Sequence, residues 1–322
     1  MLDDPILHNE WLAVAWSSEV STQGPKSHRL LGRDLVLWRS AQGVHAWEDL
    51  CLHRGAKLSL GTVSKNCLIC PYHHWEYDSS GKCIRIPTHP GQPPPTRARA
   101  TVFQVQEKYG LIWICVGTPT HDLPSFPEAE DAEFRNVLAG PYMFEANGPR
   151  VIENFLDIAH LPFVHAGLLG DPLRPEIDDY QVESSPTGIL ARDIRVWQPD
   201  PDGTGIPAQV LYTYRVLRPL SACFTKSQGE QRFCMLDTVT PVDAGLSLAW
   251  VVLSFNYAKD LPAEELRRFQ DRVSLQDKAI VESQRPELLP LDLQSELHLK
   301  SDRIAIAYRR WLKDLGLRYG TA

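Results

Sequence analysis

The sequence lacks a hydrophobic run that could cross a membrane, because no stretch of about 18 consecutive apolar residues occurs in it. Its first ten residues, MLDDPILHNE, carry acidic side chains where a secretory signal peptide has a basic segment. Both absences favour a cytoplasmic protein with no membrane attachment.

Basic clusters are absent as well. The chain has 33 Lys and Arg against 40 Asp and Glu, a formal net charge of −7. Nucleic-acid-binding surfaces are basic, so no nucleic-acid partner is expected. Small molecules or proteins remain as the expected partners. The G-x-G-x-x-G pattern of dinucleotide-binding domains is also missing. Any redox chemistry would therefore take its electrons from another protein.

The cysteines do not form the dense, even pattern of a secreted disulfide framework. There are seven in 322 residues, and an odd number in a long chain argues against such a framework. With 43% hydrophobic and 23% charged residues, the composition is typical of a globular protein, and the length is sufficient for two domains.

Two cysteines instead belong to short motifs that pair a thiol with an imidazole. Cys51 and His53 lie in CLHRG, and Cys70 and His73 lie in CPYHHW. Neighbouring turn-forming residues predict two loops, each presenting one thiolate and one imidazole. Such a set could bind tetrahedral zinc. The alternation of Cys and His favours a Rieske 2Fe-2S centre, in which two cysteines bind one iron and two histidines the other.

A second polar motif is ENFLDIAHLPFVH, from Glu153 to His165. At 100° per residue, Glu153, Asp157 and His160 fall on one stripe of a helix. Pro162 should end or kink this helix near its Leu161 neighbour, and the break would let His160 and His165 turn toward one point. The residues alone leave two interpretations open, half of an iron site or two separate structural histidines.

A possible third ligand comes from a helix predicted over residues 262–285. Its apolar stripe contains Leu266, Phe269, Val273 and Ile280, and Asp277 interrupts that stripe. A buried, ionised Asp needs a metal or a paired cation such as Arg, because unpaired burial of a charge costs several kcal/mol or more. Both partners remain open from this helix alone.

In order and spacing, the motifs CLHRG, CPYHHWEYDSSGKC and ENFLDIAHLPFVH resemble those of the Rieske non-haem iron oxygenases, and QDKAIVESQ resembles the family segment that carries an iron-binding Asp. The family more often has Pro at Leu52 and Gly at His74, and by position His74 is a neighbour of a ligand. The ligands that the resemblance implies are Cys51, His53, Cys70 and His73 for the 2Fe-2S cluster, and His160, His165 and Asp277 for a mononuclear Fe(II).

The resemblance implies a terminal oxygenase. A reductase, with or without a ferredoxin, would supply electrons through the cluster to the iron, and dioxygen would be used to hydroxylate or oxidatively demethylate a small aromatic or heterocyclic compound. Asp157 matches the aspartate that bridges the two metal sites between subunits, and Asn154 lies beside it. The short chain is similar to the homotrimeric monooxygenases and demethylases, a group that includes saxitoxin-tailoring hydroxylases.

Two interpretations of other classes are alternatives to an oxygenase. A Rieske-type electron carrier would need only the first domain. A ligand-binding module with a structural zinc would need the Cys-His loops to hold a redox-silent metal. Both leave His160, His165 and Asp277 without a role.

The predicted fold is α+β with two domains. Residues 1–118 would form an all-β Rieske domain with a hairpin at 35–38 and 44–47 and a proline-rich surface loop at 87–96. Residues 119–322 would form the catalytic domain, an antiparallel sheet packed with helices in a helix-grip, START-like arrangement. Its expected strands are 189–197, 210–217, 231–240 and 247–256, and its last helix is 302–315, capped by Ser301 and followed by Gly316.

Overall fold

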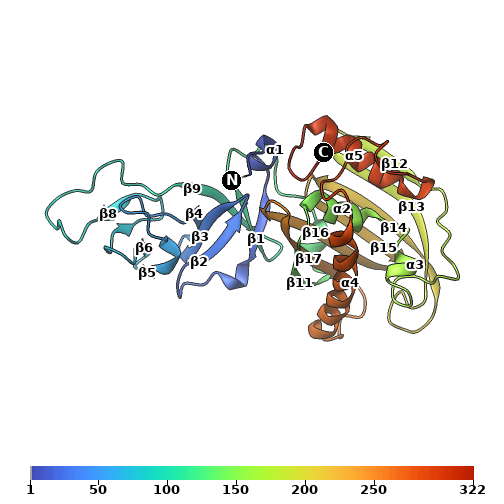
Figure 1. Ribbon diagram of the computed structural model, residues 1–322. Helices are drawn as coiled ribbons and strands as arrows, with labels where there is room; N and C mark the ends of the chain where they lie inside the picture. The colour runs from blue at the N-terminus through green and yellow to red at the C-terminus, as the bar shows by residue number, and fades with distance from the viewer. Residues whose placement is uncertain (1) are drawn as a thin grey trace. The chain divides into compact units, whose positions relative to one another are not determined.

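The computed structural model describes residues 2–322. The chain divides into two compact units, the first ending at Asp122 and the second covering Leu123–Ala322 (Figure 1). The sequence placed the domain boundary slightly earlier, after residue 118. The first unit is built of strands and the second combines a sheet with helices, as predicted. No helix within residues 2–322 is both long and apolar enough to span a membrane.

The first unit contains two antiparallel sheets, ordered β1-β10-β9-β4-β3-β2 and β5-β6-β7-β8. The strands are β1 (Leu12–Trp16), β2 (Lys26–Leu30), β3 (Arg33–Ser40), β4 (Gly43–Glu48), β5 (Thr62–Ser64), β6 (Cys67–Ile69), β7 (Glu76–Tyr77), β8 (Cys83–Arg85), β9 (Val102–Lys108) and β10 (Leu111–Cys115), with short helical turns α1 (Pro5–His8), η1 (Ser17–Glu19) and η2 (Leu58–Leu60). The predicted hairpin is confirmed as β3 and β4, and residues 87–96 form no strand.

An aromatic core supports the two Cys-His loops. The rings of Trp38 and Trp47 meet edge to face at 5.0 Å, and those of Trp47 and Tyr77 at 6.3 Å. Cys51 and Cys70 are buried in the same cluster of side chains. The loops are therefore anchored on a packed core, although their tips reach the surface.

The second unit is one seven-stranded antiparallel sheet in the order β11-β17-β16-β15-β14-β13-β12. Its strands are β11 (Arg135–Phe144), β12 (Gln181–Ser185), β13 (Gly188–Gln198), β14 (Ala208–Arg218), β15 (Ser221–Gln228), β16 (Gln231–Asp243) and β17 (Leu246–Phe255). The four predicted strands are confirmed as β13, β14, β16 and β17. The sequence did not indicate β11, β12 or β15, because a Gly-Pro pair interrupts β11 and the other two contain many polar residues.

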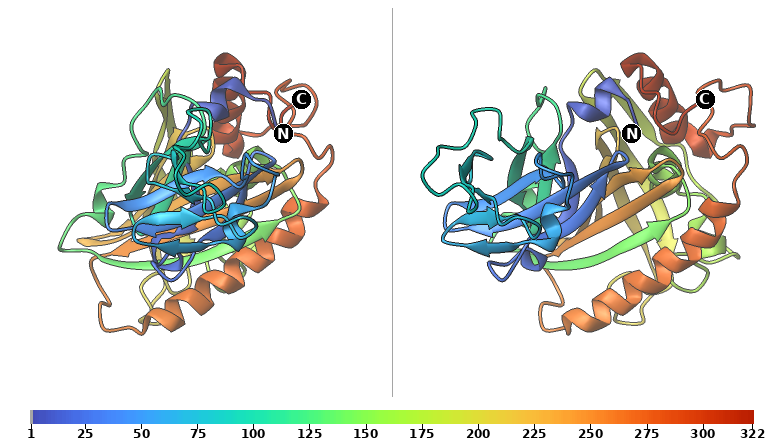
Figure 2. Two further views of the ribbon diagram at one scale, coloured as in Figure 1. Left: turned by 90° about the vertical axis from the view of Figure 1, so that its left-hand side faces the viewer. Right: turned by 60° about the vertical axis from the view of Figure 1, so that its left-hand side comes forward.

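Helices cover this sheet. They are η3 (Pro127–Ala129), α2 (Gly148–Leu156), α3 (Leu161–Val164), α4 (Ala263–Ser283), η4 (Lys300–Asp302) and α5 (Arg303–Leu315). α2 packs on β15, β16 and β17, α4 runs beside β11 (Figure 2), and α5 packs on β12 and β13. Ser301 is not the cap of α5, because η4 continues directly into that helix and places Asp302 at the N-cap. Gly316 ends α5 in the left-handed conformation, as predicted.

The helix that precedes His160, the first of the two candidate histidine ligands, is shorter than predicted. α2 ends at Leu156, and Asp157 is its C-cap with extended backbone. The Asp157 carboxylate accepts a hydrogen bond from the Ala159 N–H at 2.8 Å, a local turn that competes with helix continuation. Pro162 does not end this helix. It lies in the first turn of α3, where its missing N–H costs nothing.

Glu153 consequently does not share a stripe with Asp157 and His160. It lies in α2, is 8% exposed, and accepts a hydrogen bond from Arg309 Nη2 at 2.8 Å. Its carboxylate therefore stabilises the packing of α2 against α5 and does not belong to the group formed by the two histidines.

The buried side of α4 also differs from the predicted stripe. Phe269 and Ile280 are 39% and 45% exposed, although both were expected to be buried. The residues of α4 that are buried are Gln270, Val273, Ser274 and Val281. Gln270 and Ser274 can be buried because the Gln270 amide donates a hydrogen bond to the Ser274 hydroxyl at 3.1 Å.

Candidate functional site

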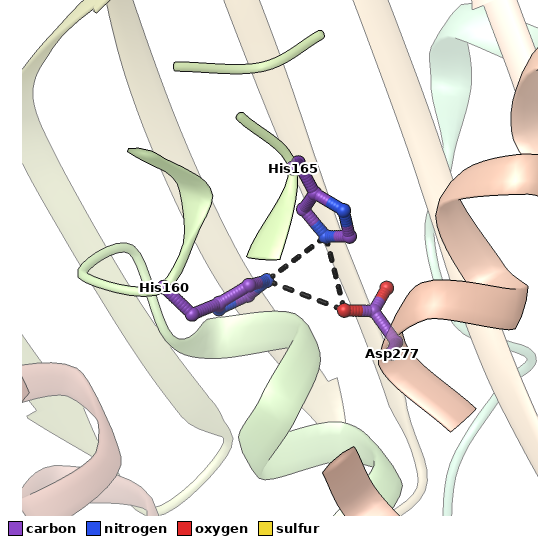
Figure 3. Close-up of side chains that lie close together, drawn as sticks. All are labelled: His160, His165 and Asp277. Atoms are coloured by element: carbon purple, nitrogen blue, oxygen red, sulfur yellow. Dashed lines mark hydrogen bonds and ion pairs between the residues drawn. The ribbon is translucent and has the colours of Figure 1, made fainter. Parts of the chain in front are cut away.

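Three predicted ligand residues meet in the second unit. His160 follows the break after α2, His165 follows α3, and Asp277 comes from α4, so residues far apart in the sequence converge. Figure 3 shows both imidazoles and the carboxylate turned toward one point. The break that separates α2 from α3 is what brings both rings to the same side.

The distances match those of ligands on one metal ion. His160 Nε2 and His165 Nε2 are 3.2 Å apart. Asp277 Oδ1 lies 3.4 Å from His160 Nε2 and 3.0 Å from His165 Nε2. Three ligands at about 2.1 Å on one face of an octahedral ion lie about 3 Å from one another. Two imidazoles and one carboxylate are also the donor set of non-haem ferrous iron, so the residues fit that metal.

The electrostatics of the three groups favour a positive charge between them. Burial acts to lower the pKa of His160, but its interactions with Asp157 and Asp277 outweigh burial and raise that pKa to about 9. Burial acts to raise the pKa of Asp277, but hydrogen bonding with His160 and His165 holds it below its usual value. A bound cation would satisfy the same preference.

A neighbouring amide fixes the orientation of His165. This side chain is 1% exposed, and its Nδ1 lies 2.9 Å from Gln276 Oε1. Because the amide oxygen only accepts, Nδ1 must carry the proton, and the lone pair of Nε2 is left for a metal. Asp157 Oδ2 lies 3.5 Å from His160 Nδ1, a longer approach on the other imidazole.

The first unit buries both cysteines of the Cys-His loops and brings their two histidines together. Cys51 and Cys70 are each 1% exposed, and Cys51 Sγ lies 3.3 Å from the Tyr77 hydroxyl. His53 Nδ1 and His73 Nδ1 face each other at 3.1 Å. Buried sulfurs and a facing pair of imidazole nitrogens suit a cluster in which thiolates hold one iron and histidines the other.

His74, the neighbour of a predicted ligand, is exposed and has a φ of 55°. Glycine adopts this left-handed conformation without strain, which explains why the family more often has Gly at this position. Leu52, where the family more often has Pro, is 48% exposed. Both departures therefore lie on the surface of the loops.

A cavity of about 370 Å³ opens beside the three converging side chains and is lined in part by them. Aromatic rings form a large part of its wall. They include Phe155, Tyr212, Tyr214, Phe224, Phe233 and Phe255. The ring of Phe155 stacks on Phe224 with a centroid separation of 5.5 Å. A cavity of this size and lining suits a planar organic molecule, and Asn154 and Asp157 also line it.

Sequence reasoning missed three polar residues at or beside this site. Gln276 directly precedes Asp277 in the motif QDKAIVESQ. Asp237 interrupts the alternation of Phe233 and Met235 on the pocket side of β16, and Lys226 lies opposite Phe233 on β15. A charged residue in an otherwise apolar alternation was the available signal for Asp237.

Two family descriptions match the chain. Residues 10–106 match the Rieske [2Fe-2S] domain, and residues 144–318 match the vanillate O-demethylase oxygenase C-terminal domain. The second match contains the two histidines and the aspartate that converge beside the cavity.

Similar proteins cover nearly the whole chain. A methylxanthine N1-demethylase of Pseudomonas putida is 32% identical over 96% of this chain and 89% of its own length. A methylxanthine N3-demethylase of the same organism is 31% identical over 98% of this chain and 91% of its own. The structure of the N1-demethylase with caffeine aligns with a TM-score of 0.83 and 31% identity, covering 96% of this chain and 91% of that one.

Proposed function

The chain belongs to the Rieske non-haem iron oxygenases, and from this membership we propose that it removes a methyl group from the nitrogen of a small heteroaromatic compound. It is a terminal oxygenase component with a Rieske [2Fe-2S] domain and a mononuclear-iron domain, and it acts with a separate reductase on a small molecule. The electron-carrier and zinc-module alternatives leave the oxygenase domain at residues 144–318 unexplained.

The proposed ligand assignment follows the sequence motifs. Cys51, His53, Cys70 and His73 hold the cluster, and His160, His165 and Asp277 hold the iron. The close approach of His53 to His73, and of His165 to Asp277, supports this assignment.

N-demethylation is supported chiefly by the aromatic-lined cavity that opens directly beside the iron-binding residues. The methylxanthine demethylases among the similar proteins act on planar N-methyl heterocycles by name. Stacked rings such as Phe155 and Phe224 would hold a planar ring by its faces and exclude water.

Oxidative N-demethylation proceeds through hydroxylation of the methyl group. When bound, the cluster and the iron deliver electrons from the reductase and activate dioxygen. An N-methyl group, dioxygen, two electrons and two protons give an N-hydroxymethyl group and water. The N-hydroxymethyl group then releases formaldehyde and leaves N–H. Gln276 keeps the His165 ring in one tautomer throughout.

Asp157 would act as the bridge between the cluster of one subunit and the iron of another in a homotrimer, with Asn154 beside it. Its 3.5 Å approach to His160 Nδ1 supports a role in orienting that ring.

A homotrimer predicts a particle of three times the 36.4 kDa chain mass in light scattering. A ferredoxin between reductase and oxygenase remains optional in this proposal. The expected cytoplasmic location is supported by cysteines that form no disulfide within residues 2–322.

The test uses anaerobically purified full-length protein, an NAD(P)H-dependent reductase, and caffeine and theobromine as probes. We expect about three irons and two sulfides per chain, and formaldehyde formed in proportion to the dioxygen consumed. Asp277→Ala should keep the colour of the cluster and form no formaldehyde. Zinc in place of iron, or a hydroxylated product that retains every methyl group, would contradict the proposal.

A further inference from the structure

Apart from Asp277 beside the two histidines, one buried carboxyl group in the wall of the cavity has an oxygen without a hydrogen-bond partner within residues 2–322. Asp237 is on β16 and is 7% exposed. Its Oδ1 atom has no hydrogen-bond partner among the residues that the structure describes. On the neighbouring strands it lies opposite Ala222 and Val251, which offer no polar side chain. The protein therefore buries a carboxyl oxygen that nothing in the fold satisfies.

Several other polar groups of the cavity are paired within the protein. The Tyr142 hydroxyl donates to Asp271 at 2.8 Å, and the Gln198 amide bonds with the Tyr212 hydroxyl at 3.0 Å. The Lys226 ammonium donates to the backbone carbonyl of Pro201 at 2.6 Å. Asp237 also lines the cavity, and it differs from these three groups because its Oδ1 has no hydrogen-bond partner in the described part of the chain.

Burying such a group is unfavourable unless a donor reaches it. Burial, reinforced by the negative charge of Asp277, raises the pKa of the Asp237 carboxyl to about 7. A ligand that donates a hydrogen bond would restore the ionised form and relieve the cost. An anionic ligand would increase the cost, because it adds negative charge beside the Asp237 carboxylate.

We propose that Asp237 is a substrate-binding residue that selects planar aromatic or heteroaromatic compounds carrying an N–H or O–H donor over their fully methylated counterparts. This inference rests on the proposed function, because it names the substrate class of the same cavity. The donor is a second feature of the substrate, separate from the methyl group that is removed.

The test measures binding in two matched pairs of compounds. Theobromine has one ring N–H where caffeine has a methyl group, and guaiacol has one O–H where veratrole has a methoxy group. Dissociation constants are measured by calorimetry on the iron-loaded full chain, without dioxygen or reductase. Wild type should bind the donor-bearing member of a pair at least about tenfold more tightly, the usual effect of a hydrogen bond to a charged group.

The variants separate the carboxyl group from the shape of the cavity. Asp237→Leu should reduce the preference to less than about twofold, and Asp237→Asn should give an intermediate value because its amide oxygen still accepts. Asp271→Asn is the control, since Asp271 is already paired with Tyr142. It should keep the preference. An equal affinity within each pair for wild type, a preference unchanged in Asp237→Leu, or no binding of either pair at millimolar concentration would overturn the inference.

Thermal unfolding without ligand gives an independent result. Asp237→Leu should melt at or above the wild-type temperature, because it removes an unpaired buried carboxyl group. A melting temperature several degrees lower would show that Asp237 has a structural role and would overturn the inference. If the proposed function is wrong, no formaldehyde forms with the reductase present. The binding preference can still be measured in that case.

Discussion

Asp157 is the residue at which the proposed link between the two metal sites can be tested. It contacts His160 only through Nδ1 and lies outside the three groups that converge on the metal position. Asp157→Ala should therefore retain iron and sulfide at wild-type levels and lose about 90–99% of turnover, as expected when a positioning carboxylate beside a ligand is removed. Single-turnover reduction of the iron by the cluster is the measurement, and normal coupled activity would rule out the bridging role.

Lys226 gives the expected pH dependence of stability. Burial lowers its pKa to about 8, and nearby Asp202 and Asp200 only partly offset that effect. Between this value and its usual pKa the unfolded chain binds more protons than the folded one, so its contribution to stability rises with pH over that range.

Urea unfolding of wild type and Lys226→Met is the corresponding experiment. The wild type should gain about 1–2 kcal/mol relative to Lys226→Met as the pH rises from about 8 to 10, a value reduced for the partial exposure of the side chain. Lys259→Met, at an exposed position, is the control. Parallel pH profiles for wild type and Lys226→Met would show that the amine keeps its ordinary pKa.

At the scale of elements, a buried ion network joins α2 to α5. Arg309 pairs with Glu153 and with Glu296, and Arg150 lies 2.8 Å from Glu296 and 3.4 Å from Glu153. Two arginines and two glutamates leave no net charge. Removing one member would leave an uncompensated buried charge, which is the costly arrangement.

Arg309→Met should therefore lower the stability of the second unit by about 3–5 kcal/mol. Adding Glu153→Leu should recover much of the loss, because it restores charge balance. Glu264→Gln breaks an exposed pair with Arg268 and should change stability by less than about 0.5 kcal/mol. Chemical unfolding followed by circular dichroism distinguishes the three, and an Arg309→Met variant as stable as wild type would show that the network is dispensable.

The elements also show where sequence reasoning succeeded. Alternating apolar residues predicted β13, β14, β16 and β17, the prolines at 262 and 286 predicted the extent of α4, and Gly316 predicted the end of α5. The end of α2 was not predictable from periodicity, because a side-chain bond from Asp157 to the backbone decides it. The buried side of α4 was missed for a similar reason, since a bond between Gln270 and Ser274 permits polar burial.

At the scale of the whole molecule, the two metal sites belong to separate compact units. The loss of one site should therefore leave the other intact. Cys70→Ser should lose acid-labile sulfide and visible colour while keeping about one iron per chain, and His160→Ala should keep sulfide and colour while losing about one iron. Metal and sulfide analysis decides this, and loss of both sites in either variant would show that their assembly is coupled.

The candidate ligands of both sites could be predicted from the sequence, because each lies in a short motif with characteristic spacing. Asp237 could not be assigned in the same way. Its free oxygen becomes evident only when β15 and β17 are seen to place Ala222 and Val251 on either side of it.

The origin of the three converging side chains has a mechanical consequence. Two come from the segment that follows α2, and the third comes from α4, which lies beyond the whole run from β12 to β17. A metal held by all three is a removable cross-link that closes a long loop, and closing such a loop reduces the entropy of the open chain. Chelation should accordingly accelerate hydrogen exchange in α4 and in the segment around α3 before the central strands respond. The iron site would then govern how firmly one wall of the substrate cavity is held.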